Sequence, residues 1–184
     1  EIEALEGWCE EGIVLRAAVN ISARLLSSPT FLDEAEHLIA ASGVPRDRLV
    51  FEVTESATLD DPEASAAALH RLCALGIAIS IDDYGTGQSS LSYLKSMPLS
   101  ELKIDRSFVQ HAHQEASDAM LVRSTIQLAH ELGLTVVAEG VEDPECLEFL
   151  RSVHCDIAQG YLIGKPMPYE EICAITAEYG RKAA

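Results

Sequence analysis

The stretch Ile79-Ser80-Ile81-Asp82-Asp83-Tyr84-Gly85-Thr86-Gly87 joins an apolar strand to two adjacent carboxylates and then to a glycine loop. Because successive side chains of a strand point to opposite faces, Asp82 and Asp83 leave one strand tip in different directions. Both carboxylates can therefore reach one small volume, where one bridges two hard cations and the other holds only the second. Two like charges at one buried point are otherwise costly, which favours a metal or substrate partner over a solvated turn.

Short β-branched runs alternate along the chain with longer helical patterns, which is typical of βα units around a parallel sheet. Most of these runs are apolar on both faces, as expected when helices cover one side and a barrel interior the other. The sequence therefore predicts an α/β fold. The predicted strands are Val14–Val19, Leu49–Thr54, Ile77–Ile81, Glu101–Ile104, Leu134–Ala138 and Asp156–Tyr161.

The intervening helices carry recognisable start and stop signals. Asp61-Pro62-Glu63 and Asp143-Pro144-Glu145 each offer an N-cap, a proline at the first helical position and an acid in the first turn. Ser28-Pro29 starts another predicted helix in the same way. A long helix is predicted from about Ser117 to Leu132, and Gly133 is expected to end it in a left-handed conformation.

The size and charge of the chain restrict its class. Its 184 residues fit one domain, and it shows no stretch apolar enough to cross a bilayer and no secretory leader. Thirty acidic residues against thirteen Lys and Arg give a net charge of -17, which argues against a surface that grips polymeric nucleic acid. A small phosphate ligand remains compatible with this charge if bound cations supply the positive potential.

The cysteine pattern favours a reducing compartment. The five cysteines are odd in number and form no Cys-x-x-Cys pair, so neither a disulfide framework nor a zinc knuckle is expected. We expect them to be small apolar residues of a cytoplasmic protein. The chain begins at Glu1, inside what reads as the end of an amphipathic helix, so it is expected to be a piece of a longer protein.

Polar side chains follow each of the six predicted strands at or near its carboxyl end. In parallel α/β folds, and above all in (β/α)8 barrels, active sites are built at this edge. Six separate segments therefore point to one functional rim. Its members are Asn20, Glu52 and Glu55, Asp82 and Asp83, Lys103 and Asp105, Glu139 and Glu142, and Gln159.

Five of these residues offer only oxygen ligands, which suit Mg2+ or Mn2+ rather than zinc or copper. They are Asn20, Glu52, Asp82, Asp83 and Glu139. Two ions that share Asp82 could activate a water and stabilise the leaving oxygen of an in-line phosphoryl displacement. Lys103 would add a fixed positive charge near that water or the phosphate, and Gln159 would orient the water. Asp105, Asn20 and Gln159 are expected to contact the substrate.

Several of these residues also have purely structural interpretations. Asn20 alone would cap the turn after its strand, and Glu55 is expected to hydrogen-bond the loop Gly85–Ser90 rather than a metal. Lys103 could pair with a buried acid or act as a Schiff-base nucleophile, but neighbouring carboxylates would keep it protonated. The histidines His111 and His113 lie in a polar connection and are expected to be solvated.

Six motifs occur in an order and spacing that resemble the EAL-domain family. They are Asn20-Ile21-Ser22, Glu52-Val53-Thr54-Glu55, Asp82-Asp83-Tyr84-Gly85-Thr86-Gly87, Leu102-Lys103-Ile104-Asp105, Ala138-Glu139-Gly140-Val141-Glu142 and Gln159-Gly160-Tyr161-Leu162. The resemblance runs from about Leu15 to Pro168 and implies a TIM-type barrel and a cytoplasmic phosphodiesterase that hydrolyses cyclic di-GMP to linear pGpG. It also implies the Mg2+ or Mn2+ ligands named above, the catalytic residues Lys103, Glu139 and Gln159, and a Glu55 that holds the Asp82–Ser90 loop, through which the family forms homodimers.

Two positions depart from the family pattern. Glu3-Ala4-Leu5 spells the letters of the family motif, but it precedes the Asn20 strand where the family has a helix, so we do not assign the ligand role to Glu3. The true motif is expected upstream, which makes residues 1–184 an N-terminally truncated single domain with about six of eight barrel strands. Gln88 stands where the family usually has an aromatic residue in the loop.

Two other functions compete with a phosphodiesterase. One is a receptor or scaffold that binds cyclic di-GMP, or only a protein partner, without hydrolysis, because the piece is expected to lack one metal ligand. The other is a Mg2+-dependent lyase or aldolase on the same fold, in which Lys103 would form a Schiff base.

Overall fold

The computed structural model describes residues 2–59, 61–85 and 91–183. Its centre is one six-stranded sheet in which each strand pairs in parallel with the next strand along the chain, in the order β1-β2-β3-β4-β5-β6. The strands are β1 (Ala17–Asn20), β2 (Leu49–Thr54), β3 (Ala78–Tyr84), β4 (Glu101–Ile104), β5 (Thr135–Ala138) and β6 (Ile157–Ala158).

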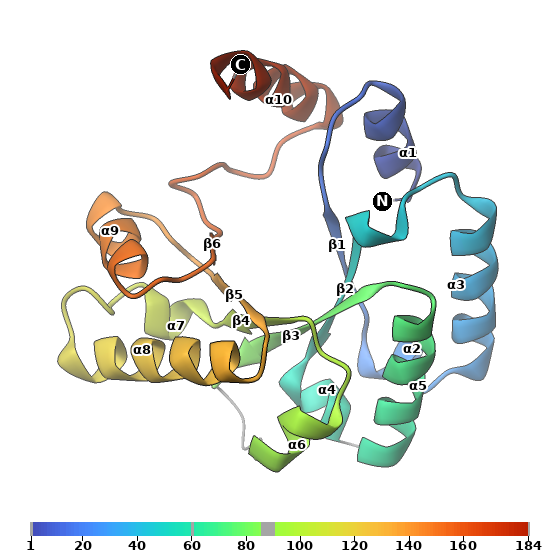
Figure 1. The fold of residues 1–184 in the computed structure, drawn as a ribbon, viewed down its shortest axis with the longest axis horizontal. Helices are drawn as coiled ribbons and strands as arrows, with labels where there is room; N and C mark the ends of the chain where they lie inside the picture. The colour runs from blue at the N-terminus through green and yellow to red at the C-terminus, as the bar shows by residue number, and fades with distance from the viewer. Residues whose placement is uncertain (1, 60, 86–90, 184) are drawn as a thin grey trace.

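Helices fill the crossovers between the strands and cover the outside of the sheet. Figure 1 shows α3 and α5 along the part of the sheet that contains β1 to β3, and α8 and α9 along the part that contains β4 to β6. The arrangement is an incomplete barrel whose two edges are β1 and β6. The helices are α1 (Ile2–Glu10), α2 (Ala23–Leu26), α3 (Pro29–Ala41), α4 (Glu55–Leu59), α5 (Pro62–Ala74), α6 (Leu91–Ser96), α7 (Arg106–Val109), α8 (Ala116–Glu131), α9 (Pro144–Ser152) and α10 (Tyr169–Ala183).

The six predicted strands are all present: β2 and β4 have the predicted bounds, and the other four have shifted ends. β1 starts at Ala17 rather than Val14, whose side chain is 69% exposed and therefore has no apolar surface to pack against. β3 continues to Tyr84, so both aspartates belong to the strand itself. β6 has only two residues, and Gly160 after it lies so close to Val141 that an added Cβ would sit 2.2 Å from the Val141 carbonyl oxygen.

The predicted helix caps are confirmed. The side chains of Ser28, Asp61 and Asp143 each accept a hydrogen bond from the backbone N–H three residues further on. Gly133, with φ of 76°, follows the end of α8 and adopts the left-handed conformation that glycine tolerates best.

The core lies between the sheet and its outer helices. Ile79, Ile81, Leu102, Ile104 and Val136 on the central strands are completely buried, which fixes the backbone positions from which the polar rim projects. None of the helices in the described part of the chain combines the length and the apolar character needed to cross a membrane.

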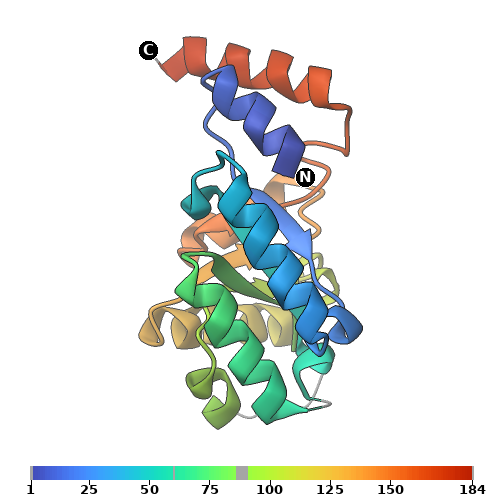
Figure 2. The same cartoon turned by 90° about the vertical axis from the view of Figure 1, so that its right-hand side faces the viewer.

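The first and last helices meet at one end of the molecule, as both ribbon views show (Figure 1, Figure 2). Trp8 of α1 stacks on Tyr169 of α10, with ring centroids 5.5 Å apart and an interplanar angle of 9°. The Tyr169 hydroxyl also donates a hydrogen bond of 3.3 Å to Glu11. These contacts tie the segment before β1 to the segment after β6.

Candidate metal centre at the carboxyl ends of the strands

Lys103 lies at the centre of the polar rim and contacts three carboxylates from three different segments. Its Nζ is 3.0 Å from Glu52 Oε1, 3.2 Å from Asp82 Oδ1 and 2.7 Å from Glu139 Oε1. The lysine is only 3% exposed. Parallel pairing of β2, β3, β4 and β5 brings these residues together, because it aligns the carboxyl ends of neighbouring strands.

The electrostatics of the rim keep Lys103 charged. Burial alone would lower the pKa of its ammonium group, but the hydrogen bonds that it donates to Glu139 and Glu52, with their negative charges, outweigh burial and hold that pKa above its ordinary value. This agrees with the prediction that neighbouring carboxylates keep Lys103 protonated. A protonated amine cannot attack a carbonyl carbon, so the aldolase interpretation finds no support in this geometry.

Asp82, Asp83 and Glu139 form a compact group of carboxylates. One ligand oxygen from each lies within 4.8 Å of those from the other two. Asp82 Oδ1 accepts a 2.9 Å hydrogen bond from the backbone N–H of Asp83, whose φ of 56° falls within the register shift of β3 between Ile81 and Tyr84. Aspartate is among the few residues that tolerate this left-handed conformation, which orients two consecutive carboxylates toward one place.

This concentration of negative charge changes the protonation of the carboxylates. Burial first, and then repulsion by Asp82 and Asp105, raises the pKa of Asp83. Burial also raises the pKa of Glu139, although Lys103 opposes that change. A bound cation would stabilise the ionised form of both residues.

The donor set fits the divalent ions that the sequence predicts. Asp82, Asp83 and Glu139 supply carboxylate oxygens, and Glu52 adds a fourth carboxylate that is 7% exposed. Neither sulfur nor imidazole nitrogen belongs to this group. Oxygen-only surroundings of this kind suit Mg2+ or Mn2+.

The other predicted rim residues lie where the parallel sheet should place them. Asn20 ends β1 directly opposite Glu52 in the strand register, and both line one cleft. Gln159 follows β6, and its backbone N–H donates to the Ala138 carbonyl, which places it beside Glu139. Asp105 accepts hydrogen bonds from the backbone N–H and hydroxyl of Ser107 and thereby caps α7. The substrate contacts predicted for these three residues stay predictions.

Glu55 contacts the loop after β3, as the sequence predicts. Its Oε2 accepts a 3.3 Å hydrogen bond from the backbone N–H of Gly85, and the residue is 3% exposed. Residues 86–90, which include Gln88 and most of the predicted dimer loop, lie outside the described residues. Glu3 belongs to α1 and not to a strand end, so the structure agrees with leaving it out of the ligand set.

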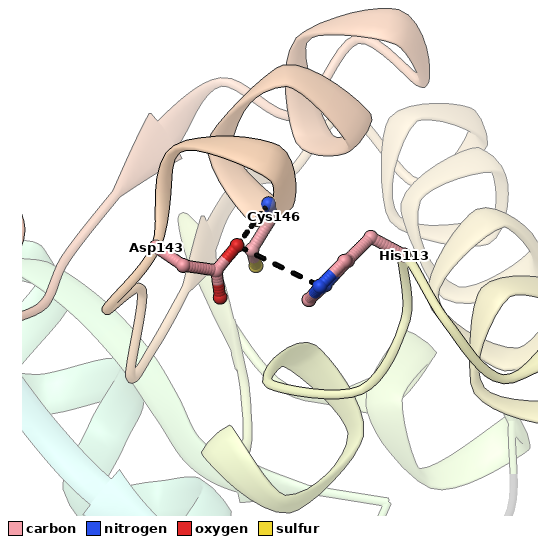
Figure 3. A group of neighbouring side chains, drawn as sticks. All are labelled: His113, Asp143 and Cys146. Carbon is pink, nitrogen blue, oxygen red and sulfur yellow. Dashed lines mark hydrogen bonds and ion pairs between the residues drawn. The ribbon is translucent and has the colours of Figure 1, made fainter.

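One cluster of side chains was missed by sequence reasoning. The prediction that His113 is solvated is wrong. Its side chain is only 13% exposed and faces Asp143 and Cys146 (Figure 3). The contact spans thirty residues of sequence, which hides it from inspection of local patterns. The one available signal is the spacing Asp143-x-x-Cys146 at a helix start, which brings both side chains to the same turn.

The fold and the rim together define a (β/α)-barrel protein with an acidic, oxygen-rich centre at the carboxyl ends of its strands. A family model described as the EAL domain matches residues 2–166. The chain therefore belongs to the EAL domain family, as the six sequence motifs indicate.

Curated relatives and solved structures agree with this assignment. Over 160 residues, or 87% of this chain, it is 42% identical to the bifunctional diguanylate cyclase/cyclic di-GMP phosphodiesterase MucR of Pseudomonas aeruginosa. It is 44% identical over 154 residues, or 84% of this chain, to the cyclic di-GMP phosphodiesterase NbdA of the same organism. The chain spans 23% and 20% of the lengths of these relatives.

Two solved structures show how far the fold likeness extends. The P. aeruginosa MucR phosphodiesterase in complex with c-di-GMP has a TM-score of 0.88 and 40% identity, covering 93% of this chain and 70% of that chain. The EAL domain of Mycobacterium smegmatis DcpA has a TM-score of 0.89 and 36% identity, covering 96% of this chain and 80% of that chain.

Proposed function

We propose that this chain is a metal-dependent phosphodiesterase domain that hydrolyses cyclic di-GMP to linear pGpG. The observation that carries the proposal is the buried Lys103 surrounded by Glu52, Asp82 and Glu139, with Asp83 beside them. Family membership and the functions of the relatives supply the substrate class.

The charge of the rim explains why such a domain needs divalent cations. A cyclic dinucleotide carries two phosphodiester groups and therefore two negative charges, and the predicted metal ligands of the rim already include four carboxylates, against one lysine. The chain as a whole has a net charge of -17. Cations at the carboxylates would reverse the local potential and allow the phosphate to approach.

The residues that would hold the ions are Asn20, Glu52, Asp82, Asp83 and Glu139. Paired Mg2+ or Mn2+ ions supply Lewis acidity and lower the pKa of a bound water. In the proposal Asp82, which lies in β3 between β2 and β4, would contribute to holding both ions. Lys103 adds a permanent positive charge that does not depend on metal occupancy.

The reaction forms one bond and breaks another at phosphorus. A water oxygen bonds to phosphorus, the bond between phosphorus and the ribose O3′ breaks, and O3′ leaves with a proton. The products are one 5′-phosphate and one 3′-hydroxyl, which is the composition of linear pGpG. In the proposal Gln159 orients the water, while Asn20 and Asp105 hold the dinucleotide along the rim.

Hydrolysis assays on the purified protein test the proposal. With Mg2+ or Mn2+ present, we expect cyclic di-GMP to be converted to pGpG, and we expect Glu139→Gln to abolish most of that conversion. Asp61→Asn is the control, because it likewise replaces a carboxylate by an amide, while Asp61 caps α5 and takes no part in the rim. Absence of both binding and turnover would sink the proposal.

A receptor that binds cyclic di-GMP without hydrolysis is the second candidate. Its support is that Lys103 already pairs with three of the predicted metal ligands, so these three carboxylates have a charged partner without ions. Calorimetric binding of cyclic di-GMP with no pGpG formed in either metal would favour this candidate over the enzyme.

We also infer that residues 1–184 act as a single domain that forms a homodimer through the Asp82–Ser90 loop. The hydrogen bond from Gly85 to the buried Glu55 supports this idea, because it ties that loop to the core. Size-exclusion chromatography should then show a larger monomer fraction for Glu55→Gln than for the unmodified protein. The five free cysteines are compatible with a reducing, cytoplasmic location.

A further inference from the structure

A second group of potential metal ligands lies outside the rim, at the start of α9. His113 comes from the connection between α7 and α8, whereas Asp143 and Cys146 come from the N-cap and first turn of α9. Figure 3 shows the imidazole of His113 directed toward the other two side chains. One ligand atom from each of the three residues lies within 4.8 Å of the others.

The contacts inside this group leave it incompletely satisfied. Asp143 Oδ1 accepts a 2.7 Å hydrogen bond from the backbone N–H of Cys146, yet it lies 3.7 Å from His113 Nε2, which is too far for a hydrogen bond. Nδ1 of His113 is buried without a hydrogen-bond partner. An unpaired buried nitrogen costs free energy and calls for an explanation.

The ring nitrogen of His113 that faces Asp143 carries a lone pair. Nε2 is 2.7 Å from the side-chain nitrogen of Gln114, which can only donate, so Nε2 accepts and Nδ1 carries the proton that lacks a partner. A metal ion would replace Gln114 as the partner of the Nε2 lone pair. The Cys146 thiol is completely buried and donates only a 3.3 Å hydrogen bond to the Val109 carbonyl.

A nucleophilic role for Cys146 fits this environment poorly. Burial first, and then the Asp143 carboxylate, raises the pKa of the thiol to about 11. Reactive cysteines have lowered pKa values and are partly exposed. A bound cation would reverse the effect on the thiol, because it favours the thiolate directly.

We propose that His113, Asp143 and Cys146 form a site for a borderline divalent transition metal such as Zn2+. A tetrahedral zinc with bonds of about 2.0–2.3 Å keeps its ligand atoms about 3.3–3.8 Å apart, so small side-chain rotations suffice to close the present spacing. Binding exchanges the thiol proton for the metal and releases that proton to solvent. A water completes the fourth position.

The proposed site does not depend on the phosphodiesterase proposal, because the two clusters share no side chain. It would fasten the connection around His113 to α9, and Asp143 follows Glu139 of the rim by only four residues. A metal here would therefore restrain the segment that carries one of the rim carboxylates.

Cobalt spectroscopy tests the site directly. Co2+ would be titrated into the purified protein in the presence of saturating Mg2+, which occupies the oxygen-only rim. We expect near-ultraviolet absorption from charge transfer between thiolate and cobalt, lost in Cys146→Ser. Cys155→Ser is the control, because Cys155 is another partly buried thiol with a raised pKa, and this variant should keep the absorption.

Two more variants test the site even if Cys146→Ser impairs folding. Asp143→Asn retains a side chain that can cap α9 but loses the charge. His113→Asn removes the imidazole. Each variant should weaken the affinity for Co2+ about tenfold or more. Asp61→Asn, at the equivalent cap of α5, should leave that affinity unchanged. Absence of the charge-transfer absorption, or its persistence in Cys146→Ser, would overturn the assignment.

Discussion

The rim around Lys103 and the cluster around His113 balance charge in opposite ways. Lys103 neutralises much of the rim through three contacts of 2.7 to 3.2 Å, so the carboxylates are stable neighbours even without an ion. Among the described residues, no Lys or Arg forms an ion pair with the His113 cluster, and Nδ1 of His113 is buried without a partner. A buried lysine therefore allows the ligands of a metal site to be preformed, whereas a site without one depends more on its metal for stability.

Removing the lysine should produce the largest effect on stability. Lys103→Met leaves Glu52, Asp82 and Glu139 buried near one another without their shared cation, and breaking a buried ion pair costs about 3–5 kcal/mol. Urea unfolding in EDTA should show this loss of free energy, and saturating Mg2+ should restore part of it. An unchanged unfolding midpoint would show that Lys103 contributes little to stability and does not neutralise the rim.

Removing one rim carboxylate should chiefly affect activity. Glu139→Gln keeps the shape of the side chain but loses both a predicted ligand and a partner of Lys103, so turnover of cyclic di-GMP should fall at least about 100-fold. Initial rates of pGpG formation measure this change. A fall of less than threefold would remove Glu139 from the proposed catalytic group.

Adding Mg2+ and then Zn2+ should distinguish the two clusters as separate binding sites. Mg2+ at about 100 times its dissociation constant should raise the free energy of unfolding by about 2.7 kcal/mol through the rim. Zn2+ added afterwards should give a second increment, additive within about 0.5 kcal/mol because the clusters share no side chain. The second increment should vanish in Cys146→Ser and persist in Cys155→Ser; competition between the ions would argue for one common site.

Lowering the pH should reduce the contribution of Mg2+ to the free energy of unfolding, and this effect should be smaller than those above. Burial raises the pKa values of Asp83 and Glu139 above their ordinary values of 3.8 and 4.5, so these groups take up protons more readily in the folded metal-free protein than in the unfolded chain. As the pH falls toward those ordinary values, protonation favours the metal-free fold and competes with Mg2+. The Mg2+ increment measured in urea should therefore shrink between about pH 7 and pH 5.

Local chemistry made much of the fold predictable. Pro-containing caps such as Asp61-Pro62 and Asp143-Pro144 act within one helical turn, and their hydrogen bonds are present as predicted. The rim was also predictable, because parallel strands bring their carboxyl ends to one edge whatever their exact bounds. The start of β1 was misplaced because β-branched sequence alone does not reveal that Val14 faces solvent.

Long-range contacts could not be predicted from the sequence. The three partners of Lys103 lie on separate segments, and only the sheet register decides which oxygens face its ammonium group. Likewise, the approach of His113 to Asp143 depends on how α7 and α9 pack, a tertiary property with no periodic signal. Sequence reasoning therefore identified the carboxylate centre but not the mixed cluster.

The contact between Trp8 and Tyr169 has a consequence for the order of folding. Every strand pairs with its neighbour in sequence, so the sheet can grow one strand at a time as the chain lengthens. The stacking of α1 on α10, by contrast, closes a loop of more than 150 residues. Because long loops are slow to close, these helices should dock last, after the sheet has formed.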